Sequence, residues 1–175
     1  QKIDFKNLYL GYLGKEAIDF WLSHISDFKD SNVLLDPAMA DSGKLYHGLD
    51  TDYVTKMRIL AKSATILTPN LTEACLLLGK NYRDFSINEI KKLALELKER
   101  FKANEQVFVI ENEKVGRSFF GTGDMFASSL LVAILAGYSL KEGVKIAATF
   151  IKMAIEVTDL TQDKRLGPNY AGALP

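Results

Sequence analysis

Short, continuous apolar runs alternate with longer amphipathic stretches along this chain, and this alternation constrains its fold more than any other feature. The short runs are apolar along their whole length, unlike the in-out pattern of a strand with one solvated face. Such strands, separated by helices, are typical of a parallel sheet covered on both faces. We therefore predict an α/β fold with a three-layer α/β/α arrangement and a mostly parallel sheet, built as a single domain over residues 1–175. The predicted strands are residues 7–12, 32–36, 64–68 and 106–110.

Helix signals fill the intervals between the predicted strands. Ser86 with Glu89, and Ser139 with Glu142, have the spacing of capping boxes, in which two side chains bond the first backbone N–H groups of a helix. In sheets of this kind ligands bind beyond the carboxyl ends of the strands, so we expect the chemistry there. The predicted helices are residues 15–28, 51–62, 71–78, 86–101, 121–137 and a last one that begins at residue 139.

Charge and composition exclude several classes of protein. The chain has 22 Lys and Arg against 22 Asp and Glu, so no basic surplus exists to bind nucleic acid phosphates. It contains no apolar run of about 18 residues, so we expect no membrane span. Cys75 is the single cysteine, which excludes an internal disulfide and favours a reducing, cytoplasmic setting. Neither a Walker-type phosphate loop nor a dinucleotide-binding Gly-x-Gly-x-x-Gly is present.

The segment Gly121-Thr122-Gly123-Asp124 precedes an apolar helix rich in small residues. Two glycines at a helix N-terminus leave backbone N–H groups open to an anion, and the helix dipole adds to the attraction. Asp124 then lies beside bound phosphate, where a carboxylate would act as general base towards a hydroxyl that attacks phosphorus. The alternative is that Asp124 only complements the helix dipole and that the glycines only form a turn.

The segment Thr68-Pro69-Asn70-Leu71-Thr72-Glu73 runs from a strand end into a helix. One interpretation is structural, with Asn70 as the N-cap and Glu73 completing the cap three residues later. The other places Glu73 near a phosphate-bound Mg²⁺, through water, because Mg²⁺ keeps much of its hydration.

A third segment starts at Asp36, which ends a buried strand, and contains a second carboxylate at Asp41. A buried carboxylate is costly unless it faces a cation or hydrogen-bond donors. Two Asp residues in a loop of small residues suit a metal–nucleotide site, whereas a simple turn is the alternative for Asp41-Ser42-Gly43.

Taken in order, these segments resemble the ribokinase-like superfamily and, within it, the pyridoxal (pyridoxine, pyridoxamine) kinases. The resemblance covers nearly the whole chain and rests on motifs of matching order and spacing. These are Gly-Tyr-Leu-Gly at 11–14, Asp-Pro-Ala-Met-Ala-Asp at 36–41, Gly-Lys-Leu-Tyr at 43–46, Thr-Pro-Asn-Leu-Thr-Glu-Ala at 68–74, Gly-Thr-Gly-Asp at 121–124 and Arg-Leu-Gly-Pro at 165–168.

The resemblance implies ATP-dependent phosphorylation of the 5′-hydroxymethyl group of a vitamin B6 pyridine. Asp124 would be the base at the substrate hydroxyl, Tyr12 would pack on the pyridine ring, and the N–H groups of residues 121–123 (Gly121, Thr122 and Gly123) would hold the transferring phosphoryl group. Glu73 with Asp36 would serve Mg²⁺. The ATP side would comprise Asp36, Asp41, Thr68 and Asn70.

The family further implies a monovalent cation such as K⁺ and a homodimer, with a small-molecule substrate and no nucleic acid or membrane partner. Two alternatives remain open, namely a hydroxymethylpyrimidine (phosphate) kinase of thiamine biosynthesis and a non-catalytic B6- or nucleotide-binding paralogue. Relatives carry a further strand before the position of Gln1 and more sheet before the glycine-rich segment. We therefore expect the N-terminal part of the domain and a segment between residues 110 and 111 to be missing.

Overall fold

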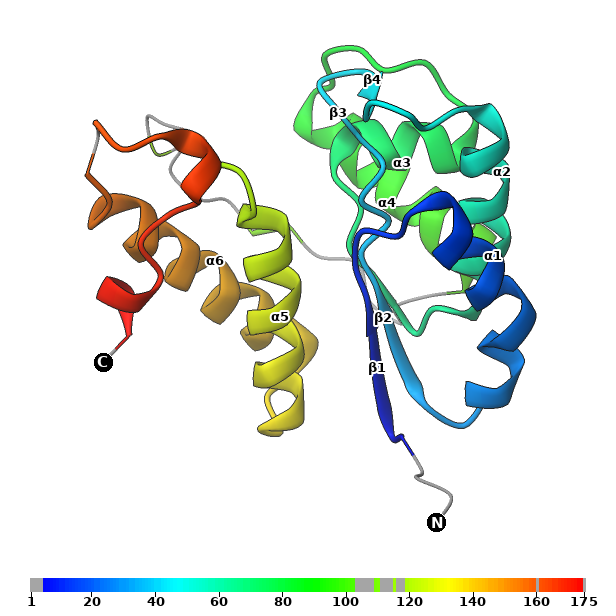
Figure 1. Ribbon diagram of the computed structural model, residues 1–175, viewed down its shortest axis with the longest axis horizontal. Coiled ribbons are helices and arrows are strands. Elements are labelled where there is room, and N and C mark those ends of the chain that lie inside the picture. Colours follow the sequence, from blue (N-terminus) through cyan, green and yellow to red (C-terminus); the bar gives the residue numbers. More distant parts are fainter. Residues whose placement is uncertain (1–4, 103–108, 111–114, 116–118, 160, 175) are drawn as a thin grey trace. The chain divides into compact units, whose positions relative to one another are not determined.

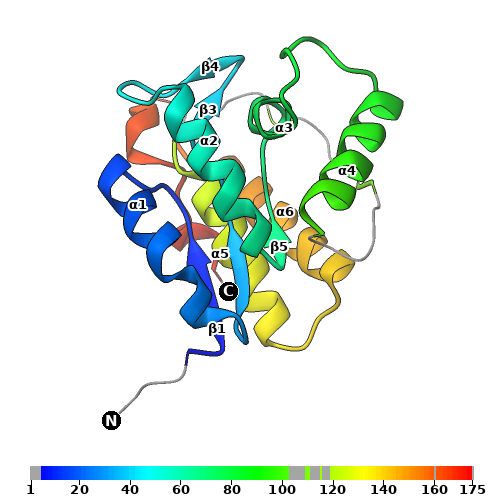
Figure 2. The same ribbon diagram turned by 90° about the vertical axis from the view of Figure 1, so that its right-hand side faces the viewer.

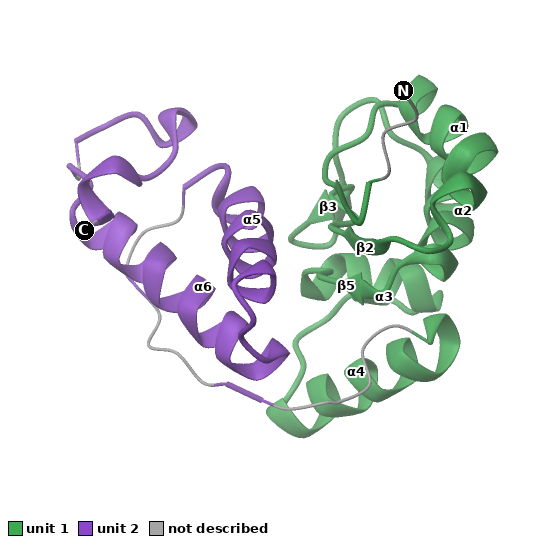
Figure 3. Ribbon diagram, turned by 90° about the horizontal axis from the view of Figure 1, so that it is seen from below, with its two compact units in different colours: residues 1–108 green, residues 109–175 purple. Residues whose placement is uncertain are grey.

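The computed structural model describes residues 5–102, 109–110, 115, 119–159 and 161–174. They fall into two compact units, residues 1–108 and 109–175 (Figure 3), which are described separately below. The single domain expected over residues 1–175 stays a prediction.

The first unit contains a parallel sheet whose strands are ordered β1-β2-β5. The connections from β1 to β2 and from β2 to β5 each contain a helix, and the strand order advances in one direction across the sheet. Right-handed crossovers that advance in one direction place their helices on the same face, and Figure 2 shows α1 and α2 side by side on one face. Its elements are β1 (Asn7–Leu10), α1 (Lys15–His24), η1 (Ile25–Phe28), β2 (Asn32–Leu35), β3 (Ala40–Asp41), β4 (Lys44–Leu45), α2 (Thr51–Leu60), η2 (Ala61–Ser63), β5 (Ile66–Leu67), α3 (Leu71–Leu78) and α4 (Ile87–Phe101).

The register of the parallel strands follows from the apolar runs. Leu10 pairs with Leu35, which in turn pairs with Leu67, so the apolar ends of three strands lie in one row. Leu35 is fully buried, and it belongs to a core that the helices complete. That core includes Ile18, Tyr53, Met57, Leu60 and Leu77.

The sequence interpretation is confirmed for the fold class and for three of the four strands. Of the predicted fourth strand, residues 106–108 lie outside the described residues, and Val109 and Ile110 are not in a strand. The small antiparallel pair β3–β4 was not predicted, because the segment 38–50 reads as a loop.

The second unit contains two packed helices, α5 (Thr122–Leu135) and α6 (Leu140–Glu156), followed by the short turns η3 (Lys164–Leu166) and η4 (Ala171–Ala173). Gly143 of α6 faces Leu130 and Ala133 of α5, and a Cβ at Gly143 would lie 3.0 Å from Leu130 Cδ1. The absence of a side chain at Gly143 therefore allows the two helices to approach closely. Both predicted capping boxes are present, at Ser86–Glu89 and Ser139–Glu142. No helix within the described part of the chain has the length and apolarity needed to cross a bilayer.

Candidate functional site

Polar side chains of the first unit gather where the parallel strands end. Asp36 directly follows β2, Thr68 directly follows β5, and Tyr12 lies two residues after β1. Figure 1 shows β1 and β2 running towards the end of this unit where the β3–β4 pair and α3 lie. The first unit therefore brings the predicted strand-end residues to one edge of the sheet.

Asp36 carries a buried carboxyl group at this edge. The residue is 6% exposed, and its backbone N–H donates to the Leu10 carbonyl over 2.8 Å, which extends the sheet ladder by one residue. Its negative charge contributes to raising the pKa of Glu73. Two carboxyl groups thus lie near each other in a region with little water.

Glu73 is 2% exposed, and both of its carboxylate oxygens accept backbone hydrogen bonds. Oε2 accepts from the Asn70 N–H over 2.8 Å, and Oε1 accepts from the N–H groups of Met39 (3.1 Å) and Ala40 (3.4 Å). Burial raises the pKa of Glu73 to about 7, and the charge of Asp36 adds to this, against the opposing effect of the backbone donors. The structural interpretation of Asn70 and Glu73 as a capping box is confirmed.

Thr68 has a buried hydroxyl oxygen for which the described residues supply no hydrogen-bond partner. A buried polar group without a partner is costly, and a bound ligand is one of the ways to satisfy it. Asn70, two residues later, uses Oδ1 to accept from the Glu73 N–H and Nδ2 to donate to the Ala40 carbonyl over 2.7 Å. Thr68 therefore offers an unused polar atom at this edge, whereas the Asn70 side chain is engaged.

Asp41 is the exposed last residue of β3, next to the turn that leads to β4, and its Oδ1 accepts from the Ser42 N–H over 2.7 Å. This contact confirms the turn interpretation of the segment. A role of Asp41 at the nucleotide end stays a prediction.

The side chains at the sheet edge fit a nucleotide-bound Mg²⁺. No cluster of three or more His, Cys, Asp or Glu side chains that could hold a metal occurs among the described residues, but Mg²⁺ commonly takes one or two carboxylates and completes its shell with phosphate and water. The buried carboxyl groups of Asp36 and Glu73 meet that requirement, and the Thr68 hydroxyl adds a further oxygen. Chemically, this edge suits a cation that arrives with its phosphates rather than a cation bound by protein groups alone.

Tyr12 is 57% exposed, and its ring lies 6.5 Å from that of Tyr46, with 50° between the ring planes. The buried Tyr53 lies near Tyr12, and its hydroxyl donates to the Leu13 carbonyl over 2.5 Å. Burial raises the pKa of Tyr53 to about 12, and the neighbouring Tyr12 makes a smaller contribution in the same direction. The edge thus exposes aromatic surface suited to a flat ring. Tyr46 was not predicted as a site residue. It directly follows β4 and ends the Gly-Lys-Leu-Tyr motif at 43–46, which was the sequence signal that could have identified it.

The glycine-rich segment belongs to the second unit. Gly121 is the N-cap of α5 with φ of 80°, a left-handed conformation that favours glycine. The Thr122 hydroxyl donates to the Phe119 carbonyl over 3.3 Å, and Asp124 lies exposed in the first turn of α5. The N-terminal turn expected of residues 121–124, with Gly123 inside it, is therefore formed, and its role towards phosphate stays a prediction.

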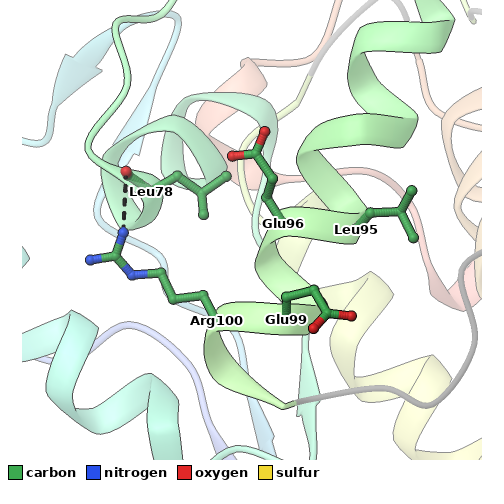
Figure 4. Close-up of a pocket in the computed structure, with 5 residues that line it drawn as sticks. All are labelled: Leu78, Leu95, Glu96, Glu99 and Arg100. Carbon is green, nitrogen blue, oxygen red and sulfur yellow. Dashed lines mark hydrogen bonds between the residues drawn. The ribbon is translucent and has the colours of Figure 1, made fainter.

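A pocket in the first unit lies away from these residues, between the end of α3 and α4 (Figure 4). There the Arg100 guanidinium donates to the Leu78 carbonyl over 3.3 Å, and Glu96 forms an ion pair with Lys80. Its lining residues are Leu78, Leu95, Glu96, Glu99 and Arg100. None of the residues predicted to carry chemistry lines this pocket.

The family model described as phosphomethylpyrimidine kinase matches residues 2–104. Over 158 residues the chain is 25% identical to the bifunctional thiamine biosynthesis protein ThiDN of Methanocaldococcus jannaschii. The matched region covers 89% of this chain and 37% of that protein. The chain spans about a third of the length of the curated relatives it matches.

Solved structures share the fold. One is from Bacteroides thetaiotaomicron, is provisionally assigned as a phosphomethylpyrimidine kinase and was solved with pyridoxal. It is 28% identical to this chain with a TM-score of 0.83, and the match covers 98% of this chain and 70% of the Bacteroides chain. The pyridoxal kinase of Staphylococcus aureus, solved with AMP-PCP and pyridoxal, is 24% identical with a TM-score of 0.70, covering 96% of this chain and 68% of its own.

Proposed function

Because this chain belongs to the phosphomethylpyrimidine kinase family, we propose that it is a kinase that transfers the γ-phosphoryl group of ATP to an alcohol. The alcohol in this proposal is the 5′-hydroxymethyl group of pyridoxal or a related B6 pyridine, since the structural neighbours of the chain include ribokinase-like pyridoxal kinases. The observation that carries a flat aromatic alcohol as substrate is the exposed ring of Tyr12, paired with Tyr46, at the same sheet edge as Asp36 and Thr68. A pyridine ring can pack on such a surface. The choice of a pyridine over a pyrimidine ring rests on the similar structure solved with pyridoxal.

In the proposed reaction, the carboxylate of Asp124 accepts the proton of the substrate hydroxymethyl group while that oxygen attacks the γ-phosphorus. The bond between the γ-phosphorus and the bridging oxygen breaks, and ADP leaves with the electron pair. The N–H groups of Gly121, Thr122 and Gly123 donate to the oxygens of the transferring group. Such positioned donors and a positioned base are the main sources of rate in phosphoryl transfer.

At the ATP end, Asp36 and Glu73 would hold the cation, Glu73 through water, since its oxygens also accept backbone bonds. Thr68, Asn70 and Asp41 would border the nucleotide. Mg²⁺, when bound, would neutralise charge on the β- and γ-phosphates. A requirement for a monovalent cation such as K⁺, a homodimeric state and a cytoplasmic location belong to the same proposal.

A second candidate is the phosphorylation of hydroxymethylpyrimidine or its phosphate, which the matching family model and the thiamine-biosynthesis relative favour. The two candidates share the alcohol chemistry and differ in the ring that the aromatic surface receives.

Parallel assays with ATP and either pyridoxal or 4-amino-5-hydroxymethyl-2-methylpyrimidine test the proposal on the full chain. We expect kcat/KM for pyridoxal to be higher by about tenfold or more, because small differences in the fit of a ring to its pocket are worth about 1–3 kcal/mol. The reverse preference would replace the proposal by the pyrimidine kinase. Binding of pyridoxal without turnover of either alcohol would identify a non-catalytic paralogue.

A further inference from the structure

Three side chains at the start of α3 hold the backbone of the β3–β4 pair. They are Asn70, Thr72 and Glu73, which we call the α3 clamp, and they bond backbone groups of residues 39–43. Asn70 and Glu73 were predicted as a cap or as cation-side residues, whereas Thr72 had no predicted role. The clamp is a tertiary contact between segments about 30 residues apart in the chain.

Each member of the clamp bonds a different part of the β3–β4 pair. The Glu73 carboxylate accepts from the N–H groups of Met39 and Ala40 at its start, and Asn70 Nδ2 donates to the Ala40 carbonyl. Thr72 Oγ1 accepts from the Gly43 N–H over 3.0 Å, inside the turn. Thr72 is 3% exposed, and its hydrogen bond to the exposed Gly43 is partly buried.

The β3–β4 pair is too short to be stable without contacts from the rest of the unit. It contains two residue pairs, Ala40 with Leu45 and Asp41 with Lys44, and even longer two-stranded hairpins are marginal in water. Its turn residues Ser42 and Gly43 have φ of 49° and 79°, and a left-handed Ser is unfavourable by itself.

Gly43 is held from a second direction. A Cβ at Gly43 would lie 2.8 Å from Cδ1 of Tyr82, so the Tyr82 ring packs directly against this glycine. From outside the β3–β4 pair, the turn is thus held by the hydrogen bond that the Gly43 N–H donates to Thr72 and by the close contact with Tyr82, in the segment between α3 and α4.

We propose that Thr72 is a positioning residue for the ATP end of the site: its hydroxyl fixes the β3–β4 turn and thereby the backbone between Asp36 and Asp41. The inference rests on the proposed function in one respect, that this backbone borders the nucleotide. Thr72 acts through the Gly43 N–H. Its loss therefore affects nucleotide binding more than the chemical step.

Thr72→Val removes the acceptor oxygen and keeps the shape of the side chain, and Thr72→Ser restores the oxygen. Thr55→Val is the matched control, since the Thr55 hydroxyl bonds the Thr51 carbonyl of its own helix on the surface of α2. The measurements on the full chain are amide hydrogen exchange at Gly43 and its neighbours, the KM for ATP at saturating Mg²⁺, kcat and the melting temperature.

We expect Thr72→Val to accelerate exchange at Gly43 about tenfold, because a typical intramolecular hydrogen bond contributes about 0.5–1.5 kcal/mol. The KM for ATP should rise by a similar factor of about ten, with kcat and the KM for the alcohol changed less than about twofold. Thr72→Ser should behave as the wild type, and Thr55→Val should leave both exchange at Gly43 and the KM for ATP unchanged.

Unchanged exchange at Gly43 in Thr72→Val, or a failure of Thr72→Ser to restore it, would overturn the clamp. Faster exchange with an unchanged KM for ATP would overturn the positioning role. If the wild type phosphorylates neither alcohol, the proposed function fails, and exchange at Gly43 together with the dissociation constant of AMP-PCP then decides the inference.

Discussion

Replacing Glu73 by Gln should change the pH dependence of the stability of this protein. Burial and the nearby Asp36 raise the pKa of Glu73 from 4.5 to about 7 in the folded state. Between these two values the folded state keeps a proton that the unfolded chain has lost. The free energy of unfolding of the wild type therefore falls as pH rises through this window and levels off above about pH 7.

The magnitude follows from the same two values. Each pH unit is worth about 1.4 kcal/mol, so the ionised form of Glu73 is disfavoured by about 3 kcal/mol in the folded state. Gln carries no titrating proton, so the variant lacks this contribution. Between about pH 5 and about pH 8, the free energy of unfolding of the wild type should therefore fall by roughly 2–3 kcal/mol relative to that of Glu73→Gln.

Urea unfolding at several pH values measures this difference, and other titrating groups cancel because both proteins contain them. Glu89→Gln is the matched control, because Glu89 also completes a capping box but is exposed and paired with Arg83. That pairing lowers the pKa of Glu89 to about 2. Its difference from the wild type should therefore be constant over the same range.

A flat difference for Glu73→Gln, or one that grows in favour of the wild type at high pH, would refute the reasoning. It would show that the backbone donors of Asn70, Met39 and Ala40 outweigh burial and keep Glu73 ionised throughout.

Three further predictions concern the second unit and the aromatic surface. Asp124→Asn should lower kcat by about 10²–10⁴, the usual contribution of a general base, while calorimetry shows unchanged AMP-PCP binding; a normal kcat would remove Asp124 from the mechanism. Gly143→Val should lower the free energy of unfolding in urea by about 1–3 kcal/mol, because the new side chain overpacks against Leu130. Lys145→Val, at an exposed position of the same helix, should change this free energy far less. Equal losses of stability in the two variants would contradict the packing argument. Tyr12→Ala should raise the KM for pyridoxal about tenfold, as expected for a lost ring contact of about 1–1.5 kcal/mol, with the KM for ATP unchanged; an unaltered KM for pyridoxal would exclude the ring contact.

The elements that sequence reasoning predicted well are those with local causes. The strands 32–36 and 64–68 are continuous apolar runs stopped by Pro37 and Pro69, and the start of α6 is set by Ser139 and Glu142, three residues apart. Such signals need no information from distant parts of the chain.

The β3–β4 pair shows why other features escaped prediction. Its strands of two residues are too short for any periodicity. What holds them is contributed by Asn70, Thr72 and Glu73, about 30 residues further along the chain. The pairing of Tyr12 with Tyr46 likewise depends on two segments that meet only at the sheet edge.

The amino-acid sequence by itself determined the α/β class, the order of the strands along the chain, the placement of Asp36 and Thr68 at strand ends and that of Glu73 in the first turn of a helix, because each depends on residues within one element. For Glu73 it left a cap and a cation-binding role open. Only the tertiary structure decided that this carboxyl group is buried beside Asp36 and that it accepts the N–H groups of Met39 and Ala40. Burial and charge proximity arise from the packing of distant segments, and no local pattern specifies them.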